Sequence, residues 1–390
     1  MGMQSEDSKM NRKNTYAVWF LLCLVCLAVM FAFVAIKESK GTKRNSEQPG
    51  LAGDTDQTNL ENQEGLGTQN NSAAQNNTVA QNNSDSQMKI GEQRVQVKNT
   101  SEKPGLIYLS LPLDVSAEQM TLENRYLEKE LLITIENANV SMDFFAQNAI
   151  CGDTSQVRAA SVCERDGRII LTISLKSILE FKSTIQDNTL LIACVDPRDL
   201  YDYIVILDPA CGGMVTSADG STVTEEEITL EIAKQVVNKS ELDNVRIYLT
   251  RLENNGKLTD SACLELLEEV EPDFYIRLSA SLVSDPSIYG IVGYYNKDYY
   301  IPRLQNVMLA DMLTKSVTIA TSNRAVGLKT VDEKRYLYEL KLPAAELSVG
   351  YLSNEQERKL LIQKEYREKI ADGILNAIVT AVLQLEADET

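Results

Sequence analysis

The stretch Tyr203–Gly213, which reads YIVILDPACGG, carries the residue types best suited to chemistry in this chain. Its apolar run Ile204–Leu207 predicts a strand that is buried on both faces. Asp208 and Cys211 follow that run, and Gly212-Gly213 allows a tight turn. Open α/β sheets place their reactive groups at the carboxyl ends of strands, so Asp208 and Cys211 are the first candidates for a functional site.

The composition limits what such a site can do. The chain has 390 residues and no histidine, which excludes imidazole metal ligands, Ser-His and Cys-His catalytic pairs, and an ordinary histidine pH switch. The formal net charge of −18 argues against a nucleic-acid partner, because nucleic acid requires a basic face.

The cysteines fall into two groups. Two lie in an N-terminal apolar segment, and five lie beyond it, at Cys151, Cys163, Cys194, Cys211 and Cys263. Five thiols cannot all pair within one chain. The spacing of Cys151 and Cys163 leaves both a hairpin bridge and two free thiols open.

The N-terminal part of the chain is expected to deliver the site to a membrane surface. Residues 1–15 are polar, and residues 16–36 are apolar without a charged residue, which predicts a transmembrane helix. The small-x-small pattern at its end is poor, which favours an uncleaved anchor over a cleaved signal peptide. Flanking basic residues do not decide the orientation. The short N-terminus and the large remainder favour a cytoplasmic tail over 1–15 and an extracytoplasmic body.

Residues 37–92 are predicted to form a disordered linker. The tract is rich in Asn, Gln and Ser, and the motif Gln-Asn-Asn-Ser/Thr recurs every six residues from Gln69 to Ser84. Such a composition does not bury enough apolar area to fold. The repeat also accounts for the Asn-x-Ser/Thr sequences, so they are not taken as glycosylation sites.

Residues 93–198 are predicted to form a small β-rich domain. Short apolar or alternating runs are separated by turn-forming residues. This rhythm is typical of an antiparallel sandwich. The expected strands are 105–111, 130–135, 168–173 and 189–193.

Residues 199–390 are predicted to form an α/β domain, since strand-like and helix-like stretches alternate. The expected fold is a mostly parallel sheet flanked by helices. Expected strands after the opening one are 245–250, 274–278, 290–295 and 345–349, and expected helices are 225–237, 260–269, 304–320 and one around 366–382.

Several segments of this domain, taken in order, resemble the zinc-dependent N-acetylmuramoyl-L-alanine amidases of the type 3 family. The family's Asp-Pro-Gly-His-Gly-Gly stands here as Asp208–Gly213, its Leu-Thr-Arg as Leu249–Arg251, and its Asp-x-Phe-Ile-Ser-Ile-His-Ala-Asn as Asp273–Ser281. Gly290–Tyr295 is similar to its Gly-x-x-x-Tyr-Tyr strand, and Pro343–Asn354 is similar to its Pro-Ala-x-Leu-x-Glu-x-Gly-Phe-x-Ser-Asn segment. The resemblance implies the amidase fold for this domain.

The resemblance also implies which residues should do the chemistry. In the family, two His and one Glu hold zinc, and a second Glu is the general base. The first His position is Cys211 here, the second is Ser279, the Glu ligand is Glu225, and the base position is Ser348. A serine hydroxyl is a poor zinc ligand and cannot replace a carboxylate base at neutral pH. We therefore expect no catalytic residues, no zinc cofactor, and a vestigial metal site of Cys211, Glu225 and Ser279.

Two chemical alternatives for Cys211 stay open. The thiolate could bind a metal together with Glu225 and Glu346, or it could act as a nucleophile, although no histidine is present to activate it. We favour Cys211 as a small residue filling the vacated pocket, or as a disulfide partner of Cys194 or Cys263.

A candidate pocket is expected around Asp208, Arg277 and Glu346. Arg277 stands where the family has a small residue, so we expect it to pair with Glu225 or Glu346 and to replace the charge of the metal. Glu225 has an alternative structural explanation as a first-turn helix residue after Thr224, a suitable N-cap.

The sequence thus predicts a single-pass, membrane-anchored and extracytoplasmic amidase homologue that is catalytically inactive. It would bind peptidoglycan or regulate a cell-wall enzyme, and its β-rich region resembles the AMIN domain that precedes cell-wall amidases. The alternatives are an active amidase that cleaves the MurNAc–L-alanine bond with an unconventional metal site, and an envelope protein-interaction module.

Overall fold

The computed structural model describes residues 91–100, 103–113, 115–136, 140–216, 220, 222–254, 260–332 and 336–387. The predicted membrane helix at 16–36 and the predicted linker up to residue 90 lie outside these residues. The chain from Met88 to Thr390 forms one compact unit.

The first part of this unit is a β-sandwich, as the strand rhythm predicts. One five-stranded sheet has the order β1-β7-β8-β5-β4 and the other has the order β2-β6-β3-β10-β9. All neighbouring strands in the two sheets run antiparallel except β2 and β6, which are parallel. The strands are β1 Glu92–Arg94, β2 Val97–Asn99, β3 Leu106–Ser110, β4 Met120–Arg125, β5 Glu130–Ile135, β6 Ile150–Gly152, β7 Val157–Arg165, β8 Arg168–Leu175, β9 Glu180–Gln186 and β10 Thr189–Val195, with a 3-10 turn at Ala117–Gln119 and the helix α2 at Met142–Gln147.

Alternating burial explains why these strands form a sandwich. In β5 and β8 every second residue is buried, and the buried side chains of both sheets join one apolar core. Asp166-Gly167 links β7 to β8 with positive φ at both residues, which suits a two-residue hairpin turn. The antiparallel sandwich is confirmed.

The second part is the predicted α/β domain. Its six-stranded sheet has the order β14-β11-β15-β18-β16-β17, in which only the β16–β18 pair is antiparallel. The strands are β11 Tyr203–Pro209, β14 Val245–Leu249, β15 Phe274–Ser281, β16 Ile291–Tyr295, β17 Ala325–Thr330 and β18 Ala344–Tyr351, and β12 Met214–Thr216 pairs with β13 Thr222–Thr224 in a separate hairpin. The helices are α3 Pro197–Leu200, α4 Glu225–Lys239, α5 Asp260–Val270, α6 Asn306–Thr321, α7 Tyr336–Glu339, α8 Glu355–Leu361 and α9 Lys364–Ala387.

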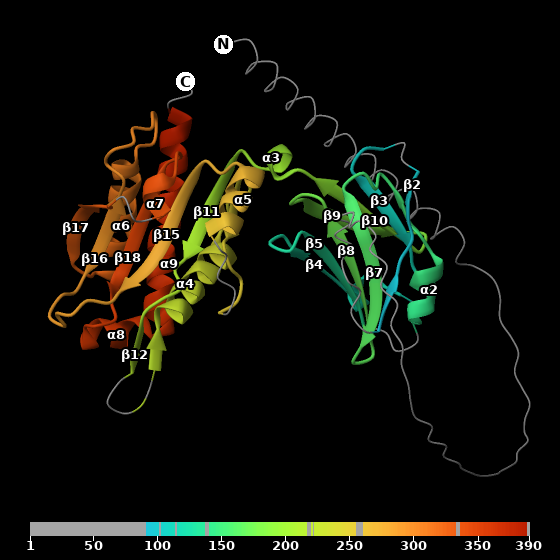
Figure 1. Ribbon diagram of the computed structural model, residues 1–390, viewed down its shortest axis with the longest axis horizontal. Coiled ribbons are helices and arrows are strands. Elements are labelled where there is room, and N and C mark those ends of the chain that lie inside the picture. The colour runs from blue at the N-terminus through green and yellow to red at the C-terminus, as the bar shows by residue number, and fades with distance from the viewer. Residues whose placement is uncertain are drawn as a thin grey trace, which may run out of the picture. The chain divides into compact units, whose positions relative to one another are not determined.

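Both faces of this sheet are covered, so its central strands are apolar throughout. In β11, Val205 and Leu207 face the core that α4, α6 and α9 close, while Ile204 and Ile206 face a second core with α5 and α7. Figure 1 shows these helices packed along the sheet. The carboxyl ends of β11, β14, β15 and β18 therefore meet at one edge, the position that the sequence predicts for the site.

Within the described part of the chain, α9 is the one helix long and apolar enough to span a membrane by length and composition. Half of its apolar window is buried inside the protein, against α4 and α6. This packing identifies α9 as a core helix of the α/β domain.

Candidate functional site

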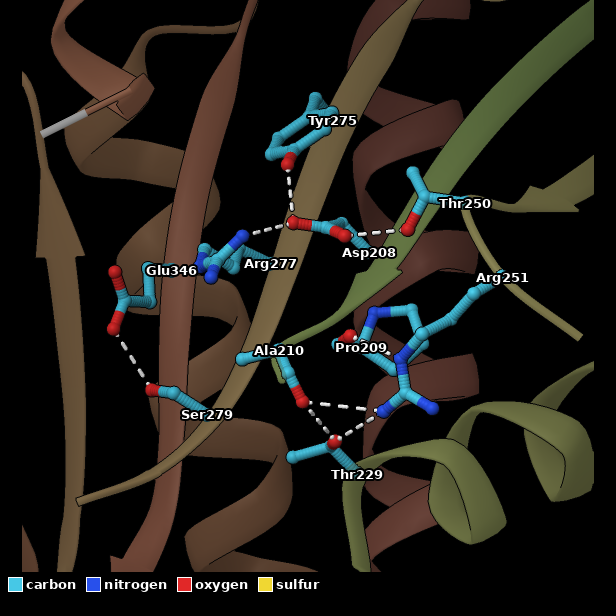
Figure 2. Close-up of polar contacts among 10 residues, drawn as sticks. All are labelled: Asp208, Pro209, Ala210, Thr229, Thr250, Arg251, Tyr275, Arg277, Ser279 and Glu346. Atoms are coloured by element: carbon cyan, nitrogen blue, oxygen red, sulfur yellow. Dashed lines mark hydrogen bonds and ion pairs between the residues drawn. The ribbon is translucent and has the colours of Figure 1, made fainter. Parts of the chain in front are cut away.

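The strand register brings three of the predicted pocket residues into one row. Asp208 on β11 is the register partner of Arg277 on β15, and Arg277 is the partner of Glu346 on β18. Figure 2 shows the three side chains on adjacent strands, with Arg277 between Asp208 and Glu346. The central position of the row, where the sequence comparison places a small residue, is thus filled by a guanidinium group.

Asp208 is the buried acceptor of this row. It forms an ion pair with Nη1 of Arg277, accepts a hydrogen bond from the hydroxyl of Tyr275 at 2.6 Å, and accepts another from the hydroxyl of Thr250. From the sequence we expect Arg277 to pair with Glu225 or Glu346. The ion pair instead uses Asp208, because the parallel register of β11 and β15 sets these two residues side by side.

Electrostatics at the row follow from this pairing. Burial by itself lowers the pKa of Arg277. The Asp208 carboxylate and the neighbouring Tyr275 raise this pKa by more than burial lowers it, so the pKa of Arg277 lies above the usual arginine value. Burial and the Asp208 charge hold the pKa of Tyr275 well above its usual value. At neutral pH Arg277 therefore stays charged, and the phenol of the neighbouring Tyr275 stays protonated.

Glu225 lies at the first position of α4, after the N-cap Thr224 whose side chain accepts from the Glu227 amide. Its Oε1 accepts a hydrogen bond from the backbone amide of Ala280 at 2.8 Å. A Cβ on Gly212 would lie 2.8 Å from Oε2 of Glu225, so a side chain at this position would require the Glu225 carboxylate to shift. Burial raises the pKa of Glu225, while the Ala280 amide and the Arg277 charge oppose the rise.

The two serines at predicted chemical positions are engaged in hydrogen bonds. Ser279 donates to Oε1 of Glu346 at 2.8 Å. Ser348 is fully buried, shares a hydrogen bond with the hydroxyl of Ser281 at 2.7 Å, and donates to the carbonyl of Gly350 at 3.2 Å. Both positions therefore lack the imidazole or carboxylate that the family has there.

Cys211 follows a turn that a buried arginine holds. Arg251 is fully buried, and its guanidinium donates to the carbonyls of Pro209 at 2.8 Å and Ala210 at 3.1 Å (Figure 2). It also donates to the carbonyl of Glu226 and to the hydroxyl of Thr229. Arg251 thus joins the Asp208 loop to the start of α4.

Within the described part of the chain, the five cysteines from Cys151 to Cys263 form no disulfide bond. The expected disulfide between Cys211 and Cys194 or Cys263 is therefore wrong, and so is the alternative of a Cys151–Cys163 bridge. Cys211 itself is half-buried.

The residues at these positions do not fit a zinc ion. A catalytic zinc needs three protein ligands and an open position. Within the described ranges, no three His, Cys, Asp or Glu side chains converge as metal ligands do. The row between Asp208 and Glu346 also holds the Arg277 cation, which would repel a divalent metal.

The structure brings together most of the predicted site residues. Asp208, Arg277, Ser279 and Glu346 lie on adjacent strands, and Ser348 is the register partner of Ser279. Four residues of the site were not predicted as such from the sequence: Thr250, Tyr275, Ser281, and Arg251, which holds the loop after Asp208. Two family-like segments contain these residues: Leu249–Arg251 at the end of β14 holds Thr250 and Arg251, and Asp273–Ser281 holds Tyr275 and Ser281.

An α/β domain with polar side chains gathered at the carboxyl ends of parallel strands has the architecture of the open α/β sheet enzymes. Residues 205–380 match the family Amidase_3, described as N-acetylmuramoyl-L-alanine amidase. This part of the chain is similar to the type 3 family of N-acetylmuramoyl-L-alanine amidases.

Named relatives agree with this family. The chain is 23% identical over 190 residues to the germination-specific N-acetylmuramoyl-L-alanine amidase of Bacillus subtilis, which covers 45% of this chain and 78% of that protein. It is 23% identical over 301 residues to N-acetylmuramoyl-L-alanine amidase LytC of the same organism, which covers 73% of this chain and 59% of that protein. Among solved structures, an N-acetylmuramoyl-L-alanine amidase from Clostridium difficile 630 is similar with a TM-score of 0.41 and 20% identity, covering 46% of this chain and 96% of that chain.

Proposed function

We propose that this protein is a catalytically inactive amidase homologue that binds peptidoglycan or regulates cell-wall remodelling. The observation that carries the proposal is the Asp208–Arg277 ion pair at the centre of the site. An arginine side chain is permanently charged and offers no lone pair to a metal. It supplies a fixed positive charge beside the carboxylates without providing a Lewis acid or an activated water.

The serines support the same proposal. Hydrolysis of an amide bond needs a group that removes a proton from the attacking water. Ser348 stands at the position of the family's general base, and a serine hydroxyl stays protonated at neutral pH. The Ser279 hydroxyl is directed to Glu346, so Glu346 and Ser279 satisfy each other.

The rest of the proposal concerns where the protein acts. We infer a cytoplasmic tail at 1–15, a transmembrane helix at 16–36, a linker at 37–92, an AMIN-like domain at 93–198 and the amidase-like domain at 199–390. This organisation places the body outside the membrane on a tether, near peptidoglycan. The absence of charge in residues 16–36 and the β-sandwich that precedes the amidase-like domain support it.

Sedimentation with purified, insoluble peptidoglycan tests the binding part. The full chain in detergent is expected to sediment with the peptidoglycan and to release no peptide from it. An active amidase from the same family is the positive control for release. A chain that stays in the supernatant would overturn peptidoglycan binding and leave an envelope protein as the partner.

Restoring the family residues tests the inactivity part. The variant Cys211→His, Ser279→His, Ser348→Glu and Arg277→Ser replaces each altered chemical position and removes the competing cation. We expect this variant to bind zinc tightly while the wild type does not. Equal zinc binding by the two proteins would contradict the proposed reason for inactivity.

A further inference from the structure

The edge strand β14 of the amidase-like domain is capped by a side chain from the β-sandwich. The hydroxyl of Tyr126, which follows β4, donates to the carbonyl of Leu249 at 2.9 Å and accepts from the amide of Leu249 at 3.0 Å. An edge strand leaves such backbone groups without a strand partner. Tyr126 is itself buried, so this double contact takes place away from water.

A buried acid adds a second contact to the same strand. Glu180, at the start of β9, accepts from Nε of Arg246 at 2.7 Å and from the hydroxyl of Tyr248 at 2.7 Å. The Glu180 side chain is 12% exposed. The ring of Tyr126 also meets the ring of Tyr248 edge-on, with centroids 4.9 Å apart. We call these contacts of Tyr126 and Glu180 with β14 the β14 contact.

Helix α5 extends the β14 contact. Lys129 of the sandwich pairs with Glu269 at 2.7 Å and with Glu265 at 3.0 Å. The amide of Ile178 donates to Glu269 at 2.7 Å. The side chains of Tyr126 and Ile178 belong to the same apolar cluster as residues of α5 and β14. The two domains therefore share part of one core.

The residues that follow Leu249 hold the candidate site. Thr250 donates to Asp208, and Arg251 donates to the carbonyls of Pro209 and Ala210. Tyr126 fixes the backbone one residue before Thr250. The sandwich is thus linked to the loop that carries Cys211 by the hydrogen bonds of Tyr126 to Leu249, the backbone from Leu249 to Arg251, and the hydrogen bonds of Thr250 and Arg251.

We propose that the β-sandwich is a positioning partner of the amidase-like domain, and that Tyr126 holds the end of β14 so that Thr250 and Arg251 keep the loop after Asp208 in place. The sandwich then completes the site rather than acting as a separately tethered binding module. This inference is independent of whether the site binds peptidoglycan, because it concerns only the geometry of the loop.

Hydrogen exchange of the full chain in detergent tests the inference with Tyr126→Phe, which removes the hydroxyl and keeps the ring. The informative amides are those of Ala210, which donates to Leu278, and of Thr250, which donates to Leu207. Losing two neutral hydrogen bonds is expected to raise exchange at these amides about tenfold. Exchange in β18, a central strand of the same sheet, is expected to stay as in the wild type.

Two further variants make the test specific. Glu180→Gln weakens the pairing with Arg246 and is expected to raise exchange at Thr250 as well. Tyr108→Phe is the matched control, because its hydroxyl contacts Thr100 within the sandwich, and it is expected to leave both amides unchanged. Wild-type exchange at Ala210 in Tyr126→Phe would overturn the inference. An equal rise in β18 would overturn it too, since that would indicate a global loss of stability.

Discussion

Replacing Arg277 by methionine removes the cation from the site and keeps most of the side-chain volume. In the structure the Asp208 side chain is 12% exposed and the Arg277 side chain is 29% exposed. Removing one partner of a fully buried ion pair costs about 3–5 kcal/mol. The partial exposure of Arg277 and the hydroxyl donors Thr250 and Tyr275, which still serve the carboxylate, reduce the expected loss to about 2 kcal/mol.

The measurement is thermal unfolding followed by circular dichroism. A loss of about 2 kcal/mol in a domain of this size lowers the melting temperature by roughly 4–8 °C. Adding Asp208→Asn to the Arg277→Met chain removes the unpaired charge, so part of the stability is expected to return, with a coupling of about 1–3 kcal/mol. An unchanged melting temperature in Arg277→Met would refute the reasoning, and so would strict additivity of the two substitutions.

Arg168→Met is the control for this experiment. Its ion pair with Glu136 spans 3.7 Å at the surface, with side chains 54% and 63% exposed. Exposed pairs of this kind contribute little, so we expect a change within about 0.5 kcal/mol. The comparison separates loss of a buried charge pair from loss of any arginine.

Three other predictions concern titration, packing and thiol reactivity. Burial raises the pKa of Glu225, so its contribution to stability is present below about pH 4.3 and is lost as the pH rises through the folded-state pKa. The variant Glu225→Gln keeps an acceptor for the Ala280 amide and should therefore melt at a higher temperature than the wild type at pH 7. A difference in melting temperature that grows toward pH 4 would contradict this. A Cβ on Gly373 would lie 2.7 Å from the Cα of Val317, so Gly373→Ala should lower the free energy of unfolding in urea by about 1–2 kcal/mol, although alanine has the better helix propensity. An unchanged urea midpoint would count against the packing of α6 on α9. Burial raises the pKa of Cys194 to about 12, so iodoacetamide at pH 8 should label this thiol far more slowly in the folded than in the unfolded protein. Equal labelling rates would show that the fold does not protect the thiol.

Buried regular elements were the most predictable part of the fold. The apolar runs of β11, β15 and β18 and the period of α9 predict these elements closely, because both faces of the sheet and one face of the helix are covered. Strand β17 was not predicted, because its edge position leaves it without a continuous apolar pattern. Edge strands are specified by pairing more than by burial, so local pattern is a weak guide to them.

The candidate site shows a similar division. The family resemblance predicts that Asp208, Arg277 and Glu346 lie around one pocket, and the structure places them on adjacent strands. It does not give the register between β11 and β15, and that register makes Asp208 the partner of Arg277. Contacts across strands depend on tertiary pairing, which one-dimensional spacing does not contain.

The β14 contact was hidden from the sequence for the same reason. Tyr126 and Leu249 are 123 positions apart, and nothing in the local pattern around either residue marks the pair. The sequence pattern predicts two separate domains with a boundary at residue 198. The shared apolar cluster links Tyr126 and Ile178 to the amidase-like domain across that boundary.

The most direct test of the central claim combines zinc analysis with a hydrolysis assay on the same preparation. The full chain is purified, equilibrated with zinc, freed of unbound metal, and incubated with a muropeptide that contains the MurNAc–L-alanine bond. We predict that no stoichiometric zinc is retained and that no peptide is released. Stoichiometric zinc together with peptide release that is lost on Cys211→Ala would contradict the claim and establish an active amidase with an unconventional metal site.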